Sequence, residues 1–492
     1  MTNPSLLSSS ALELARRVRA GELSAEALTR ASLDAIAAEN GALGAFLSVA
    51  GERALEVARG IDLRRERGEA LGPLAGVPVG VKDVLATTDL PTTAASRILL
   101  RELGAVPDAS RGYVSPYDAT AVARLRAADA VIVGKCNLDE LAMGSSSETS
   151  AFFPVRNPLD PSRTPGGSSG GSAVAVAAGM VPLSLGTDTG GSVRQPASLT
   201  GTVGFKPSYG RVSRYGLFAF ASSLDQVGSF ARDVRGAARL TEIVAGHDPL
   251  DATSLDAEVG DLVQACDGGL EGLRVGVPRE AFAEGTEPEV EARVREALER
   301  MGARGARIVP ISLPSTKHAI ATYYVLATAE ASSNLARYDG VRFGLRVHDG
   351  ASPLGELYAE TRGRGFGAEV KRRIILGTFV LSAGYYDAYY LRAQRARRLV
   401  CLDYARAFDE VDVVVSPTSP VVAFELGSRT SDPLAMYAAD ACTLPASLAG
   451  LPALSLPCGV AEPPGGGPKL PVGLQIVGPP RRDDLVLRAA AY

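Results

Sequence analysis

Short apolar runs alternate with amphipathic segments along most of the chain. Ser10 and Ser24 can each cap an amphipathic helix near the start. Near-continuous Val, Ile and Leu runs predict strands covered on both faces at 77–81, 131–134, 273–277, 411–416, 453–457 and 473–477, and a helix is expected over 118–130. This alternation predicts an α/β fold with a mixed central β-sheet covered by helices on both faces.

The 492 residues show no long polar linker and no internal repeat. The Gly- and Pro-rich segment 462–468 lies between two expected strands and is typical of a loop. We therefore expect a single large domain over residues 1–492.

Composition limits the possible partners and location. A net charge of −4 gives no general attraction to nucleic acid or to anionic membranes. Five scattered cysteines without a CxxC pair favour neither structural zinc nor a disulfide framework. The first residues lack the pattern of a signal peptide, and no apolar run reaches membrane-spanning length. We expect a cytoplasmic protein that contacts no membrane and holds no metal.

The segment 164–198 contains two Gly-Gly-Ser units around a strongly apolar run, and three interpretations of it compete. The glycines permit turns while the serines cap helices. Alternatively the segment cradles a phosphate, although no GK[ST] or G-x-G-x-x-G pattern accompanies it. The third interpretation is nucleophilic catalysis. Residues 167–171 match the G-x-S-x-G elbow formally, but the elbow requires a preceding strand and the residues here are rich in turn formers.

A serine nucleophile needs a base, and the three histidines lie outside every such segment. Lysine is the usual substitute. Lys82 follows the apolar strand at 77–81, where loss of water lowers the pKa of an ammonium group and favours the neutral amine. A lysine after a strand is more often a surface residue, so the prediction depends on the two Gly-Gly-Ser units.

Three motifs in order, "GVPVGVKD", "TPGGSSGGSA" and "GTDTGGSVRQPA", resemble the amidase signature family, whose Ser-cis-Ser-Lys triad hydrolyses amides. The resemblance makes Lys82 the base, Ser168 the cis-serine that relays the proton and Ser192 the acylated nucleophile. The glycines before Ser192 allow several backbone N–H groups to face one point, which predicts an oxyanion hole from Thr189, Gly190 and Gly191.

The resemblance also divides the expected domain. Its signature core covers about residues 74–230, and the C-terminal part, about 273–492, completes the sheet and the substrate pocket. Four further stretches, 210–234, 245–254, 323–344 and 365–390, are similar to one branch of the family, the A subunits of glutamyl-tRNA(Gln) or aspartyl-tRNA(Asn) amidotransferases.

That branch implies a glutaminase that works through an acyl-serine and supplies ammonia. Its partners would be a B subunit, which uses ATP and Mg²⁺ on Glu-tRNA(Gln) or Asp-tRNA(Asn), and a small C subunit, in a heterotrimer. No cofactor is expected in this chain. Two other functions stay open: a free-standing amidase for small or aryl amides, and a catalytically silent scaffold.

Glutamine carries an amine and a carboxylate, so its pocket needs a carboxylate and a cation. The resemblance assigns these to Asp440 and Arg373, with Tyr324 alongside, and leaves the register open against Tyr323 and Arg372. Without the resemblance, Arg373 would be a solvated helix charge and Asp440 a surface or capping residue.

Overall fold

The structure is a computed structural model that describes residues 6–282, 285–347 and 353–492. Its strands are β1 (Phe46–Val49), β2 (Pro78–Lys82), β3 (Val131–Cys136), β4 (Leu183–Asp188), β5 (Val203–Lys206), β6 (Gln226–Ala231), β7 (Arg274–Pro278), β8 (Arg307–Ile311), β9 (Val413–Pro417), β10 (Ala453–Ala461) and β11 (Leu470–Val477).

The α-helices are α1 (Ala11–Arg19), α2 (Ala25–Leu43), α3 (Gly51–Glu66), α4 (Thr120–Ala127), α5 (Gly170–Ala177), α6 (Arg194–Thr200), α7 (Val234–Val244), α8 (Leu262–Ala265), α9 (Pro288–Ala303), α10 (Ala319–Asn334), α11 (Leu354–Gly365), α12 (Ala368–Leu381), α13 (Arg392–Glu410), α14 (Pro433–Ala438), α15 (Leu444–Leu448) and α16 (Asp483–Ala490). A π-helical turn, Asp387–Leu391, precedes α13.

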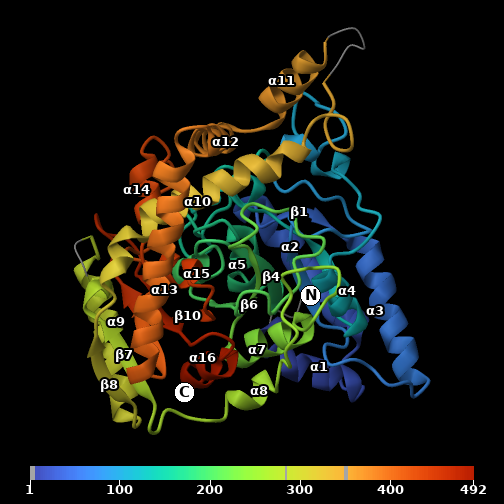
Figure 1. The fold of residues 1–492 in the computed structure, drawn as a ribbon. Helices are drawn as coiled ribbons and strands as arrows, with labels where there is room; N and C mark the ends of the chain where they lie inside the picture. The colour runs from blue at the N-terminus through green and yellow to red at the C-terminus, as the bar shows by residue number, and fades with distance from the viewer. Residues whose placement is uncertain (1–5, 283–284, 348–352) are drawn as a thin grey trace.

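All the described strands join one mixed sheet in the order β1-β3-β2-β4-β6-β5-β10-β11-β9-β7-β8. β2 pairs parallel with β3 and β4, and β7 pairs parallel with β8 and β9. All the other neighbouring pairs in this order are antiparallel. Figure 1 places β7 and β8 at one edge beside α9, and α10, α12 and α13 together above that side. The predicted α/β fold with a mixed sheet is confirmed, and strands from both expected parts of the chain belong to it.

The two predicted capped helices are α1 and α2, and the hydroxyls of Ser10 and Ser24 accept hydrogen bonds from the first-turn N–H groups of Glu13 and Ala27. All six predicted strands form, although the helix expected over 118–130 covers only Thr120–Ala127. The hydrophobic pattern missed β1, β4, β5, β6 and β8.

The active region lies where neighbouring strands end. β2 and β4 are adjacent and parallel, with Val81 opposite Leu185. Both strands are buried along their whole length. Their carboxyl ends therefore bring Lys82 close to Thr187, at the edge of a sheet where α/β folds commonly place their sites.

Candidate active site

Lys82 is fully buried among three hydroxyl groups. Its Nζ lies 2.8 Å from Ser168 Oγ, from Ser169 Oγ and from Thr187 Oγ1. The two serines precede α5, and the peptide bond between Gly167 and Ser168 is cis, as the resemblance implies. No carboxylate pairs with the amine within the described part of the chain.

Burial lowers the pKa of Lys82 to about 7, although Asp139, Asp188 and Asp225 act to raise it. A neutral amine has two N–H groups and one lone pair, so one of the three hydroxyls must donate to it. The Ser169 hydroxyl hydrogen is engaged by the carbonyl of Thr187 at 3.0 Å. Ser168 and Thr187 have no other acceptor for their hydroxyl hydrogens among the described residues, so either can donate to Lys82.

Ser192 lies between β4 and α6 and keeps 8% exposure, whereas Lys82 and Ser168 have none. Its hydroxyl makes no hydrogen bond within the described residues. The N–H groups of Thr189, Gly190, Gly191 and Ser192 likewise have no acceptor there, and the next N–H, of Val193, donates to Asp188 at 3.1 Å. Four consecutive unpaired donors, which include the three predicted from the sequence, suit an oxyanion.

Buried charges hold this turn in place. Asp188 pairs with Arg194 at 2.9 Å, and both side chains are fully buried. Asp225 accepts from the Thr189 hydroxyl at 2.8 Å. A Cβ on Gly191, whose φ is +156°, would overlap Thr443 Oγ1, so the turn requires glycine at that position.

Arg373 is 3% exposed, on the inner side of α12, while the side chain of Arg372 is 44% exposed. Arg373 therefore is not a solvated helix charge. Its Nε donates to Glu369 at 2.8 Å, and its two terminal nitrogens donate to no described residue. The guanidinium lies 5.4 Å from the ring centroid of Tyr324, which stacks on Tyr437 at 3.7 Å.

Asp440 is also buried. Its Oδ2 accepts from the hydroxyl of Ser145, while Oδ1 has no donor among the described residues. Burial raises the pKa of Asp440 to about 7. The Asp440 carbonyl accepts from Thr443 N at 3.0 Å, and Thr443 packs on Gly191, so the carboxylate belongs to the segment directly beside the Ser192 turn.

Tyr323 and Tyr324 both face this region from α10. A Cβ on Gly190 would lie 2.8 Å from Tyr323 Cζ, so Tyr323 covers the oxyanion turn. Tyr324 instead contacts Arg373. A cavity of about 260 Å³ is lined in part by Ser145, Glu369, Arg373 and Tyr437.

Several residues of the site were missed from the sequence. Ser169 and Thr187 complete the shell of Lys82, Ser145 binds Asp440, and Glu369 orients Arg373. Ser169 and Thr187 lie within the motifs "TPGGSSGGSA" and "GTDTGGSVRQPA", which could have drawn attention to them.

Across the described ranges, no group of three or more His, Cys, Asp and Glu side chains could hold a metal ion. No helix in that part of the chain is both long and apolar enough to cross a bilayer.

Comparison with known proteins gives the family of the chain. A family model described as Amidase matches residues 27–487. The A subunit of glutamyl-tRNA(Gln) amidotransferase from Myxococcus xanthus is 57% identical over 97% of this chain and 95% of its own, and the Symbiobacterium thermophilum protein of the same name is 54% identical over 98% and 95%.

Solved structures are similar over almost the whole chain. The crystal structure of the glutamyl-tRNA(Gln) amidotransferase A subunit from Thermotoga maritima has a TM-score of 0.79 and 41% identity, covering 100% of this chain and 95% of its own. A peptide amidase bound to the inhibitor chymostatin has a TM-score of 0.81 and 31% identity, covering 98% and 96%.

Proposed function

The chain belongs to the amidase family, and on that premise we propose that it is the glutaminase subunit of a glutamyl-tRNA(Gln) amidotransferase. The observation that carries the proposal is a pair of buried groups near the Ser192 turn: Arg373, with free terminal nitrogens, and Asp440, with a free oxygen, close enough for the arginine charge to act on the pKa of the carboxyl. Glutamine needs both groups, whereas a simple amide needs neither.

In the proposed mechanism, neutral Lys82 accepts the hydroxyl proton of Ser168 while Ser168 Oγ takes the proton of Ser192. Ser192 Oγ then attacks the side-chain carbonyl carbon of glutamine. The N–H groups of Gly190, Gly191 and Ser192 stabilise the oxyanion, and each such donor contributes about 3 kcal/mol in comparable sites.

Collapse of the tetrahedral intermediate breaks the C–N bond, and the proton returns through Ser168 to the leaving nitrogen. The products of this half-reaction are ammonia and a glutamyl ester on Ser192. Water, deprotonated by the same relay, hydrolyses the ester and releases glutamate. No step requires a cofactor bound to this chain.

Arg373 would bind the α-carboxylate of glutamine through its two terminal nitrogens, a bidentate geometry that arginine provides and lysine does not. Asp440 Oδ1 would accept from the α-ammonium group. Tyr324 lies against the guanidinium and limits its movement. These contacts select glutamine over amides that lack the amino-acid end.

The relatives are named as one lettered subunit of an amidotransferase, which implies partners, and we propose a heterotrimer with B and C subunits in the cytoplasm. ATP and Mg²⁺ would act at the B subunit, on Glu-tRNA(Gln). A patch of exposed apolar side chains supports such an assembly, since patches of this kind mark protein interaction sites. The patch consists of Ile375, Leu376, Phe379, Tyr385, Tyr386 and Tyr389, on α12 and the segment that follows it.

The test is a glutamine analogue with an electrophilic carbon in place of the amide, followed by mass spectrometry of the digested protein. We expect one adduct, on Ser192, which free glutamine prevents. An adduct on Ser168 or Ser169 would overturn the assignment, and the Ser192→Ala protein serves as the control.

A free-standing amidase remains the second candidate, because a peptide amidase has the same fold at 31% identity. The two functions differ in substrate. A free-standing amidase would hydrolyse small or aryl amides at least as well as glutamine, whereas the proposed glutaminase would not.

A further inference from the structure

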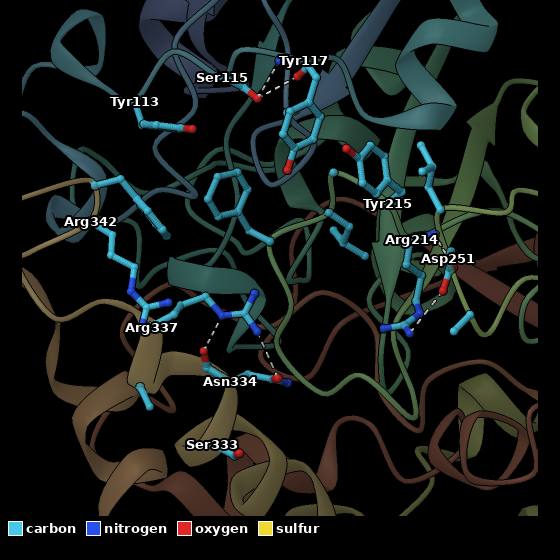
Figure 2. A pocket seen from close by; sticks show the side chains of 18 residues that line it. Tyr113, Ser115, Tyr117, Arg214, Tyr215, Asp251, Ser333, Asn334, Arg337 and Arg342 are labelled. Carbon is cyan, nitrogen blue, oxygen red and sulfur yellow. Dashed lines mark hydrogen bonds and ion pairs between the residues drawn. The ribbon is translucent and has the colours of Figure 1, made fainter.

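A second pocket, of about 700 Å³, contains none of the residues discussed above. Figure 2 shows Arg337 and Arg342 on one side of it, Arg214 on the other, and the rings of Tyr117 and Tyr215 along the wall between them. Pockets of this volume commonly receive a small ligand or a segment of another chain.

Three of the stretches that resemble amidotransferase A subunits meet in this pocket. The stretch 210–234 contributes residues 214–218, the stretch 245–254 contributes 250–252, and the stretch 323–344 contributes residues between 333 and 343. The amide chemistry proposed above uses no side chain of this lining. The lining therefore favours a role that is specific to the amidotransferase and separate from amide hydrolysis.

The pocket carries an excess of positive charge. Arg214 lies 3.7 Å from Asp251, and Arg342 lies 3.5 Å from Asp339. Arg337 donates only to the carbonyl and side-chain oxygens of Asn334, and it has no carboxylate partner among the described residues.

A further arginine, Arg362, donates to the carbonyls of Leu335 and Tyr338, in the segment that carries Arg337. On a chain whose net charge is −4, this local excess favours an acidic partner.

The pocket also offers apolar surface. Tyr117 stacks on Tyr215 with ring centroids 4.9 Å apart, and Tyr117 and Leu250 are 44% and 63% exposed. Exposed tyrosine together with arginine is the composition of protein interfaces. Among the described residues that line the pocket, Gly216 is the only glycine, so this part of the lining has no glycine-rich loop of the kind that cradles phosphate. A peptide fits these features better than a nucleotide does.

We propose that this pocket docks an acidic segment of a partner protein in the amidotransferase. One large apolar side chain of that segment would lie on Tyr117 and Tyr215, and its carboxylates would pair with Arg337 and Arg342. The inference rests on the proposed function, because that function supplies the partner.

Short contacts join the pocket to the active site. Gly216 O accepts from Ala86 N and Phe218 N donates to Val84 O, both at 2.9 Å, in the segment after Lys82. Asn334 donates to the carbonyl of Phe220, whose ring centroid lies 5.5 Å from the guanidinium of Arg373. A segment docked here would therefore restrain the residues that follow Lys82 and also Phe220, which contacts Arg373.

The test measures the Kd between the purified full-length chain and the partner subunits from the same organism, at low and high salt. Arg337→Glu and Arg342→Glu should each weaken binding about tenfold or more and reduce its salt dependence. Tyr117→Ala should weaken binding without changing the salt dependence. Arg67→Glu, an exposed arginine at the end of α3, is the matched control and should bind as wild type does. Thermal unfolding verifies that each variant folds.

Wild-type Kd values for all three pocket variants would overturn the proposal. So would variants that assemble normally but lose binding of a fluorescent ATP analogue or of tRNA that the wild-type chain binds, because the pocket would then belong to a nucleotide or RNA. Ammonia release from glutamine is measured in parallel. Its absence from the wild-type assembly contradicts the proposed function. Normal release with unchanged variant Kd values contradicts only the docking inference.

Discussion

At the scale of single residues, the chain distinguishes between three buried lysines. Lys82, Lys135 and Lys206 are all at most 1% exposed. Lys135 forms an ion pair with Asp83 at 3.1 Å, and Lys206 donates to the backbone carbonyls of Pro207 and Leu451. Burial lowers the pKa of both Lys82 and Lys206 to about 7, but only Lys82 contacts serine hydroxyls. Burial alone therefore does not distinguish the proposed base from Lys206, whereas the contacts with serine hydroxyls do.

This contrast gives a matched pair of variants. Lys82→Met keeps the length and apolar stem of the side chain but removes the proton acceptor, and we expect glutamine hydrolysis to fall by roughly 10³-fold or more. Lys206→Met removes an equally buried amine and should lower the thermal unfolding midpoint while leaving kcat within a few fold. Steady-state ammonia release measures both variants, and equal activity losses would show that Lys82 has only a structural role.

The pH dependence follows from two groups whose pKa values converge. Burial lowers the pKa of Lys82 and raises that of Asp440, each to about 7, and the reaction needs neutral Lys82 and ionised Asp440. Lys82 and Asp440 must each lose one proton before the enzyme is in its active state. The logarithm of kcat/KM for glutamine should therefore climb with a slope near two below about pH 6 and flatten above about pH 8.

A substrate without the amine gives the control. 4-Carbamoylbutanoate has no ammonium group for Asp440 to bind, so the ionisation of Asp440 should not affect its hydrolysis. The logarithm of kcat/KM for this substrate should therefore rise with a slope near one below about pH 6. A slope of one for glutamine as well would mean that Asp440 does not bind the amine.

Some residues of the site could be predicted from the sequence and others could not, for a physical reason. Lys82, Ser168 and Ser192 lie in the three motifs that carry the resemblance to the amidase signature family. Glu369 and Ser145 act only by contacting side chains distant in sequence, at Arg373 and Asp440. Single-sequence patterns contain no information about such contacts.

At the scale of elements, the hydrophobic pattern found strands made of Val, Ile and Leu and missed those diluted by small or polar residues. β4 and β6 carry Gly, Ser and Thr or Gln, yet every residue in them is buried. β8 lies at the sheet edge, contains Pro310 and exposes most of its residues. Their positions depend on the neighbouring strands more than on their own sequences.

Helix α12 buries Arg373 and exposes Arg372, and this favours Arg373 as the proposed ligand in the register that the sequence left open. We expect Arg373→Gln to raise KM for glutamine by roughly 10²-fold, more than it lowers kcat, because it removes a bidentate, desolvated contact with the carboxylate. Arg372→Gln, the exposed neighbour that shares Glu369, should change KM less than threefold. Glutaminase kinetics on both proteins measure this, and the opposite ranking would transfer the role to Arg372.

At the scale of the whole molecule, the glutamine site is joined to surfaces that are open in the isolated chain. α12 carries Arg373 inward and Ile375 and Phe379 outward, and the latter two are 68% and 45% exposed. The rings of Phe379 and Tyr385 lie 4.4 Å apart in the same patch. A partner that covers this patch would restrain the helix that carries Arg373, the proposed ligand of the substrate carboxylate.

We therefore expect glutaminase activity to depend on assembly. Adding the partner subunits should raise kcat/KM for glutamine by about tenfold or more, within the range of ordinary coupling between sites, and Glu-tRNA(Gln) with ATP should raise it further. Steady-state ammonia release from the isolated chain, from the assembly and from the assembly with tRNA and ATP measures the three states. A Ser192→Ala assembly should lose glutamine-dependent amidation of Glu-tRNA(Gln) and keep the reaction with free ammonia, since only the supply of ammonia depends on that residue. Full activity of the isolated chain, unchanged by any addition, would favour the free-standing amidase. Hydrolysis by such an enzyme is not coupled to an ammonia acceptor, and restraining α12 would not increase it.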